Sequence, residues 1–217
     1  RQAQMELHFE HWLTGAVDSS FADCGATARS TSGYIIWFAG IPLEWECKRQ
    51  PLVTMSTMES EYVAASKCVN AIRALNKYLS FAGLNSKSPT TILEDNTACI
   101  VVATTTNPVH RMRTRHIALR FHNVREAVRD GAVSLKHVWT EHQVADIFTK
   151  SIPRTTFERF RDVLFGRVTF DEMCMKHPKP IVLETTAEVH KITTNVSTWP
   201  MYQIPIERES LLGDLIA

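Results

Sequence analysis

The chain lacks several features that would place it in an extreme class of protein. No apolar run approaches the roughly 18 residues that a membrane-spanning helix needs, which excludes an integral helical membrane protein. Neither sign of charge dominates, since 24 Lys and Arg stand against 23 Asp and Glu. This balance excludes a strongly basic nucleic-acid coat and an acidic tail protein, although a locally basic face stays open. Internal repeats and low-complexity tracts are also missing.

Cysteine usage excludes two further classes. The five cysteines are odd in number, widely spaced and form no C-x-x-C pair, so they indicate neither a disulfide framework nor a zinc site. We therefore expect a reducing, intracellular compartment. The first residue is Arg1 rather than Met, and residues 1–13 lack the continuous apolar stretch of a signal peptide. This suggests a piece of a longer polypeptide.

The composition is that of a globular protein that can bury a core. Hydrophobic residues make up 44% of the 217 residues and charged residues 22%. The clearest predicted element is a helix over 58–82, where apolar residues recur at steps of three and four. A capping box opens it at Ser56–Glu59, and Gly83 ends it. Before this helix, β-rich segments predict strands at 13–19, 33–39 and 43–47.

After this helix, strands and helices alternate. The pattern predicts strands at 90–94 and 133–139, and helices at 97–104, 113–129, 140–148 and 153–164. From about Arg167 the pattern weakens, and prolines interrupt it; residues 211–216 indicate one short docking helix. An antiparallel strand group followed by alternating units predicts an α/β fold, a mixed sheet with helices on its faces.

Four carboxylates occupy the ends of these elements: Asp18, Glu61, Asp95 and Asp146. If the elements pack as one α/β layer, all four converge at one edge of the sheet. Convergent carboxylates repel one another. A bound Mg²⁺ ion removes this repulsion, because carboxylate oxygens are the ligands that it prefers. Two such ions about 4 Å apart activate a water and stabilise the leaving oxygen of a phosphodiester. The alternative is an N-cap role for Asp95, a first-turn role for Glu61 and simple exposure for Asp146.

Several short motifs occur together in one order. They are Arg29-Ser30-Thr31-Ser32-Gly33-Tyr34, Ser56-Thr57-Met58-Glu59-Ser60-Glu61-Tyr62, Glu94-Asp95-Asn96, Thr114-Arg115-His116-Ile117, Phe121-His122-Asn123-Val124-Arg125-Glu126 and Ala145-Asp146-Ile147-Phe148-Thr149-Lys150. In this combination the chain closely resembles the ribonuclease H (RNase H) domain of copia-type retrotransposon polyproteins. The resemblance covers about residues 13–165, and the combination is highly specific although each piece is short.

The resemblance implies an RNase H-like fold, a mixed five-stranded sheet flanked by helices. It implies that residues 1–12 are the remnant of an upstream polymerase connection and that residues 13–165 are the domain. Residues 166–217 lie beyond the resemblance and form a C-terminal extension, which we expect to pack peripherally or to be partly disordered and to be unnecessary for the nuclease core. The resemblance also implies cleavage of the RNA strand of RNA–DNA hybrids with two Mg²⁺ ions, Mn²⁺ being the substitute. The implied partners are the hybrid and an upstream reverse transcriptase domain, with no membrane. The implied location is the cytoplasm, in virus-like particles, and the nucleus.

Carried over residue by residue, the resemblance assigns catalysis and metal binding to Asp18, Glu61, Asp95 and Asp146. The surroundings depart from the family pattern at three positions. Ser20 and Phe21 stand where the family usually has Asp and Trp, and Ala118 stands where it usually has Asp. The alternative function is therefore a degenerate, non-catalytic nucleic-acid-binding or interaction remnant with the same fold.

The densest cationic segment is 110–129, with six arginines against one acid. It predicts either a phosphate-contacting face for a hybrid duplex or a solvated helix face. The nucleic-acid contacts that we expect are Arg29, Ser30, Thr31, Asn96, Arg115, His116, His122, Arg125 and Arg129. His116 and His122 are candidates for proton transfer or for a structural role.

Three tryptophans lie in apolar strand segments, namely Trp37, Trp45 and Trp139. We predict that all three belong to the core rather than to a base-stacking surface.

Overall fold

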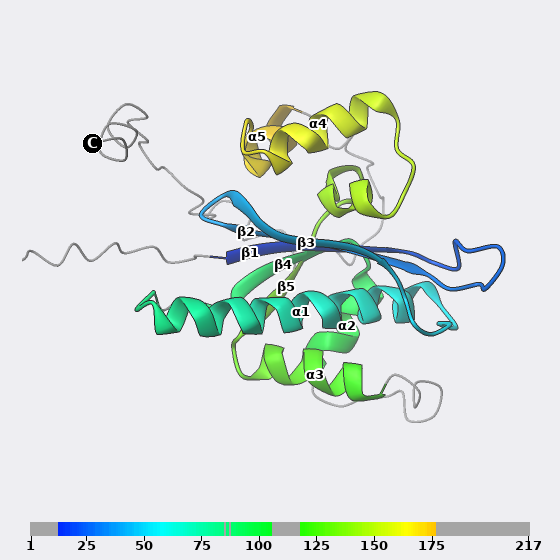
Figure 1. Cartoon of the computed structure of the whole chain (residues 1–217), viewed down its shortest axis with the longest axis horizontal. Helices are drawn as coiled ribbons and strands as arrows, with labels where there is room; N and C mark the ends of the chain where they lie inside the picture. Colours follow the sequence, from blue (N-terminus) through cyan, green and yellow to red (C-terminus); the bar gives the residue numbers. More distant parts are fainter. Residues whose placement is uncertain (1–12, 85, 87, 106–117, 177–217) are drawn as a thin grey trace, which may run out of the picture. The chain divides into compact units, whose positions relative to one another are not determined.

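Five strands form one mixed sheet in the order β3-β2-β1-β4-β5 (Figure 1). The computed structural model describes residues 13–84, 86, 88–105 and 118–176. The strands are β1 (Leu13–Ser20), β2 (Thr31–Phe38), β3 (Ile41–Arg49), β4 (Thr90–Glu94) and β5 (Val133–His137). The β1–β2 and β2–β3 pairs are antiparallel, whereas β1–β4 and β4–β5 are parallel. The mixed α/β sheet expected from the sequence is therefore confirmed.

Three helices cover one face of this sheet (Figure 1): α1 (Thr57–Phe81), α2 (Thr97–Thr104) and α3 (Ala118–Arg129). Their core includes Val17 and Ile36 of the sheet and Ile72 of α1, all fully or almost fully buried. Tyr62 of α1 stacks on Phe121 of α3 with 4.1 Å between ring centroids. This packing fixes α1 against β1, so the first turn of α1 is held at one end of the sheet.

The opposite face carries a second core. It lies under the 3-10 helix η3 (Val144–Phe148) and under α4 (Arg154–Leu164) and α5 (Phe170–Lys176). A further 3-10 helix, η2 (Thr140–His142), precedes η3. Ile35 and Leu93 of the sheet pack there with Phe160 and Met173 of the helices. The central strands β1 and β4, which pair in parallel, are thus buried on both faces, whereas the edge strand β3 stays largely exposed.

The start of α1 follows its sequence signals closely. The Ser56 side chain accepts a hydrogen bond from the Glu59 N–H, and Glu59 in turn accepts one from the Met55 N–H. The capping box is therefore present, with its second bond shifted by one residue. At the other end Gly83 has φ +81°, the left-handed conformation that stops a helix with least strain in glycine.

One predicted helix is wrong. The segment 140–148 forms η2 and η3 instead of a continuous α-helix. The reason is tertiary: the fully buried Gln143 side chain donates to the Val17 carbonyl of β1 and accepts from the Ala145 N–H. Tying this side chain to the sheet interrupts the helical register between the two short turns.

Helix α5 is not expected from the sequence. Its first turn is closed by a reciprocal pair, in which Glu172 accepts from the Thr169 N–H and Thr169 accepts from the Glu172 N–H. Met173 is 1% exposed, so α5 contributes to the second core. The predicted boundary between residues 165 and 166 stays a prediction. Residues 1–12 and the predicted helix at 211–216 lie outside the described residues. In the part of the chain that the structure describes, no helix has the length and apolarity to span a membrane.

Candidate active site

Three of the predicted carboxylates come together at one end of the sheet. Asp18 lies near the end of β1, Glu61 in the second turn of α1, and Asp95 directly after β4. One oxygen from each of them lies within 4.8 Å of the others. The parallel pairing of β1 with β4 explains the approach of Asp18 and Asp95, because both strands end at this edge. Glu61 joins them because the core holds α1 across β1.

Asp146 is brought to the same place through η3. The Lys150 ammonium lies 3.0 Å from the Asp18 carboxylate and 2.8 Å from the Asp146 carboxylate, and bridges the two. The Thr149 hydroxyl also donates to Asp18. Gly33 makes this approach possible: it pairs with Asp18 across β1 and β2, and a Cβ there would lie 2.7 Å from Phe148 and Thr149. The predicted convergence of all four carboxylates is present in the structure.

We call Asp18, Glu61, Glu94, Asp95 and Asp146 the acidic cluster. Burial raises the pKa of Glu61 well above its ordinary value, and the neighbouring Glu94 adds to the shift. Burial likewise raises the pKa of Asp18, although Lys150 counteracts part of it. The pKa of Asp146 rises to about 7, first through burial and then through Asp18. The cluster therefore disfavours its own full ionisation when no cation balances it.

Burial alone would lower the pKa of Lys150, but its contacts with Asp18 and Asp146 outweigh this and raise it. One ammonium is thus shared by two of the carboxylates. Glu61 Oε2 is buried and has no hydrogen-bond partner among the described residues. A buried carboxylate oxygen without a donor is costly, and a cation removes that cost. Three converging hard oxygen donors with such an unpartnered atom fit Mg²⁺ or Mn²⁺.

Buried polar side chains hold the backbone around the cluster. The Ser19 hydroxyl donates to Ser60 at 2.8 Å, which ties β1 to the first turn of α1. Gln50 is fully buried and donates to the Ser32 hydroxyl and to the Ser60 carbonyl, each at 2.9 Å. These bonds fix the relative positions of β1, β2 and α1 beside Asp18 and Glu61.

Sequence reasoning missed three residues of the site. Lys150 lies in one of the sequence motifs, but no role was predicted for it. Its position four residues after Asp146 is nevertheless a signal for an ion pair. Glu94 is fully buried next to Asp95, and its Oε1 accepts the Asn96 N–H. Thr140 donates to the Asp95 carboxylate at 2.9 Å. No sequence pattern predicts the contact of Thr140 with Asp95, because it depends on the pairing of β4 with β5.

The N-cap role that was the alternative for Asp95 is taken by its neighbour. The N-cap of α2 is Asn96, whose side-chain oxygen accepts from the Cys99 N–H at 3.0 Å. Asp95 is therefore not the cap of this helix, and its carboxylate is directed to the cluster and to Thr140.

The expected nucleic-acid contacts are spread over several surfaces. Arg29 is exposed, and Thr31 donates to Asp23. Ser30 is fully buried, and its hydroxyl accepts from the Ala22 N–H and bonds to Thr54. Ser30 thus supports the loop after β1 and has no surface with which to contact a ligand directly, which corrects that expectation.

On α3, His122 is exposed, while two arginines are engaged within the protein. Arg125 donates to the Thr105 carbonyl. Arg129 pairs with Glu126 and Asp130, and its side chain is 75% exposed. Arg115 and His116 lie outside the described residues, so their placement stays a prediction.

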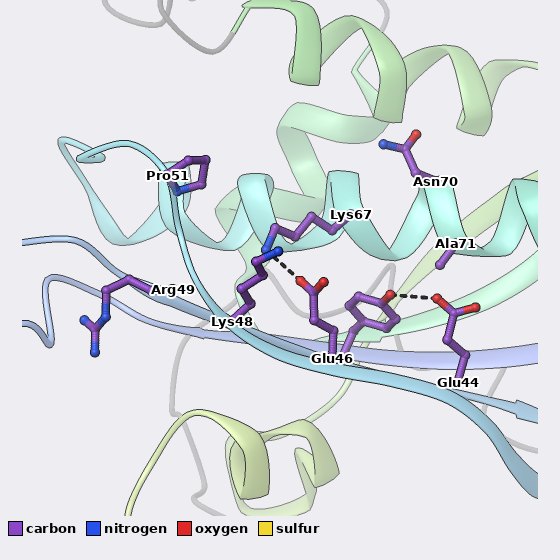
Figure 2. Close-up of a pocket in the computed structure, with 9 residues that line it drawn as sticks. Glu44, Glu46, Lys48, Arg49, Pro51, Lys67, Asn70 and Ala71 are labelled. Atoms are coloured by element: carbon purple, nitrogen blue, oxygen red, sulfur yellow. Dashed lines mark hydrogen bonds and ion pairs between the residues drawn. The ribbon is translucent and has the colours of Figure 1, made fainter.

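A groove between β3 and α1 lies apart from the acidic cluster (Figure 2). Figure 2 shows its two internal contacts, from Lys67 to Glu46 and from the Tyr34 hydroxyl to Glu44. Charges of both signs line it; the ion pair of Lys67 with Glu46 neutralises two of them, and Tyr34 donates a hydrogen bond to a third, Glu44. We assign it no ligand.

Comparison with known proteins finds related sequences of one kind, the Pol polyproteins of transposons. No protein-family model matches the chain. The chain is 30% identical over 152 residues to the retrovirus-related Pol polyprotein from transposon TNT 1-94 of Nicotiana tabacum, covering 70% of this chain and 11% of that protein. It is 34% identical over 131 residues to the corresponding polyprotein from transposon RE1 of Arabidopsis thaliana, covering 60% and 9%. The chain thus spans about a tenth of the length of these relatives.

Among solved structures, the chain is similar to LC11-RNase H1, isolated from compost by a metagenomic approach. The identity is 13%, the TM-score 0.49, and the match covers 65% of this chain and 94% of the other. The strand order β3-β2-β1-β4-β5, antiparallel on one side of β1 and parallel on the other, independently gives the RNase H-like arrangement. With the similarity above, this chain matches a segment of the copia-type retrotransposon Pol polyproteins and carries an RNase H-like domain.

Proposed function

We propose that this domain is a metal-dependent ribonuclease that cleaves the RNA strand of RNA–DNA hybrids. The observation that carries the proposal is the approach of Asp18, Glu61 and Asp95 to within 4.8 Å from three separate elements. Folding brings these negative charges together against their mutual repulsion, which is the arrangement that a divalent-cation site requires. Homology to Pol polyproteins supports a nuclease role.

Asp18, Glu61 and Asp95 would hold one divalent cation, and Asp18 with Asp146 a second. When bound, two such ions supply the positive charge that activates water and stabilises the leaving oxygen of a phosphodiester. The residues of this chain orient and balance that chemistry. Thr140 holds the Asp95 carboxylate, while Ser19 and Ser60 fix β1 against α1.

Lys150 has a separate role in the same proposal. Its ammonium bridges Asp18 and Asp146 and balances them while no cation is bound there. It therefore keeps the cluster folded in the metal-free protein. A cation held by Asp18 and Asp146 would compete with the Lys150 ammonium for the same carboxylate oxygens, because the two positive charges repel each other.

The test is a cleavage assay with an RNA–DNA hybrid, an RNA duplex and a DNA duplex, each with Mg²⁺, with Mn²⁺ and with EDTA. We expect cleavage of the RNA strand of the hybrid only, and none with EDTA. Asp95→Asn should lower the rate by about a hundredfold or more, since a ligand charge is lost. Asp130→Asn is the matched control, because Asp130 is exposed and its described ion-pair partner is Arg129.

The fold should survive Asp95→Asn, because Asn96 rather than Asp95 caps α2. Circular dichroism and unfolding in urea check this. Equal cleavage rates for wild type and Asp95→Asn would contradict the proposal. Hybrid binding without any cleavage would instead support the non-catalytic remnant, in which Lys150 permanently takes the place of a cation.

A further inference from the structure

Trp139 is not a core residue, contrary to the expectation from the sequence. It lies two residues after the end of β5, and 49% of its surface is exposed. Trp37 is 7% exposed and does belong to the core, whereas Trp45 is 60% exposed on β3. Two exposed indole rings therefore lie at opposite edges of the sheet, since β3 and β5 are its outer strands. Trp139 immediately precedes Thr140, which contacts Asp95 of the acidic cluster, whereas Trp45 lies on the other outer strand, β3.

The position of Trp139 beside the cluster follows from strand pairing. Glu94 pairs with His137, and the Val138 N–H donates to the Glu94 carbonyl at 3.0 Å, so β4 and β5 stay aligned to their ends. The next residue after Trp139 is Thr140, whose hydroxyl bonds to the Asp95 carboxylate at 2.9 Å. Trp139 is thus one residue along the chain from a direct contact with a proposed metal ligand.

The ring is also held in place before any ligand arrives. His137 packs against it edge to face, with 4.9 Å between centroids and 89° between planes. The Trp139 carbonyl accepts from the His142 N–H at 2.7 Å, which closes the turn at η2. A ring fixed in this way loses little conformational freedom when a flat group stacks on it.

We propose that Trp139, supported by His137, is a stacking platform for a nucleobase or sugar of the substrate next to the acidic cluster. The inference rests on the proposed function, which places a nucleic-acid strand at this edge. An exposed indole packs on the apolar face of a sugar in a duplex or on an unpaired base, so it binds a strand without reading its sequence. The platform holds the strand on the β5 side of the cluster by stacking that does not depend on phosphate charge.

The test compares Trp139→Ala, Trp139→Phe and the matched control Trp45→Ala in the full chain. Binding of a fluorescein-labelled RNA–DNA hybrid is followed by anisotropy with Ca²⁺ replacing Mg²⁺ to suppress cleavage. We expect Trp139→Ala to bind roughly tenfold more weakly, Trp139→Phe within about threefold of wild type, and Trp45→Ala like wild type. KM with Mg²⁺ should follow the same order, with kcat changed less. Calorimetric Mn²⁺ binding without nucleic acid should be the same in all four proteins.

The outcomes separate the platform from the proposed function. Cleavage by wild type with equal hybrid affinity and KM for Trp139→Ala overturns the platform and leaves the ribonuclease proposal standing. Absent cleavage, combined with hybrid binding that still weakens in Trp139→Ala and recovers in Trp139→Phe, supports the platform and overturns the ribonuclease proposal. Equal weakening by Trp45→Ala, or no binding by the wild type, also overturns the platform.

Discussion

The acidic cluster and the core beneath α4 and α5 lie next to each other and are built on opposite principles. In that core, apolar residues such as Phe160 and Met173 are almost fully buried, and burial stabilises the fold. In the cluster, Asp18 and Glu94 are just as buried but carry carboxyl groups whose pKa values burial raises. The first region stabilises the domain, whereas the second costs stability until a cation balances it.

The two regions are under different constraints on their sequence. A protein selected only for stability would place apolar side chains at both locations, because replacing buried charge by apolar groups is often neutral or stabilising. The cluster therefore indicates function. The packing around it offsets the free energy of folding that the buried carboxyl groups cost. Changes in the core should lower stability, while changes in the cluster should alter activity and the response to pH and metal.

The largest expected effect on stability is at the core. A chain that ends at Phe165 lacks α5 and so lacks Met173, which is 1% exposed. Its free energy of unfolding should fall by about 2–5 kcal/mol, the range for removing a large buried side chain. A chain that ends at Lys176 should match the full chain, as expected for a dispensable extension. Urea unfolding measures all three, and equal stability of the two shortened chains would show that α5 contributes nothing.

The next effect concerns the ammonium that joins the two carboxylates. Lys150→Met leaves Asp18, which is fully buried, without its cation. Breaking a fully buried pair costs about 3–5 kcal/mol, and the 36% exposure of Lys150 reduces our expectation to roughly 1–3 kcal/mol in EDTA. Added Mg²⁺ should stabilise this variant more than the wild type. Lys150→Arg is the control, and a Met variant with wild-type stability in EDTA would rule out the balancing role.

A smaller effect is the pH dependence of the metal-free protein. The pKa values of Asp18, Glu61, Glu94 and Asp146 are all raised on folding. The folded state therefore binds more protons than the unfolded state above the unfolded pKa values, so stability falls as the pH rises. For Asp146 the window runs from 3.8 to about 7.

Thermal unfolding in EDTA between pH 4 and pH 8 checks this sign. Glu94→Gln removes one of these groups while it keeps the oxygen that accepts the Asn96 N–H. Its melting temperature should fall less steeply with pH than that of the wild type, by a few degrees over this range. Mg²⁺ should flatten the wild-type curve as well. A wild-type curve that rises with pH would contradict the raised pKa values.

The smallest effect is expected on α3. Arg125 already donates to a carbonyl, and Arg129 already pairs with two acids. Arg125→Ala with Arg129→Ala should weaken hybrid binding mainly at low salt. Log affinity falls as log salt concentration rises. Removing an arginine that binds a phosphate should make this fall less steep, by roughly 0.9 or less in the slope. Metal binding should be unchanged, and an unchanged slope would assign this face to solvent.

The sequence by itself predicted the elements whose signals are local. The cap at Ser56, the left-handed Gly83 and the periodicity of α1 all depend on neighbours within a few residues, so α1 differs from its prediction by one residue at each end. The strand Thr90–Glu94 and the helix Thr97–Thr104 agree with their predicted bounds. Motif order identified the four carboxylates, which the structure then brought to one edge of the sheet.

Contacts between segments that are distant in the sequence could be found only from the tertiary structure. Gln143 reaches the Val17 carbonyl and breaks a predicted helix into two turns, and Gly33 admits η3 close to Asp18. The pairing of β4 with β5 places Thr140 on Asp95 and leaves Trp139 exposed. Burial of Glu94 and the shared ammonium of Lys150 arise in the same way. Apart from the spacing of Lys150 four residues after Asp146, none of these has a local signal. The partners are many residues apart, and the free energies of their interactions exist only after the sheet has formed.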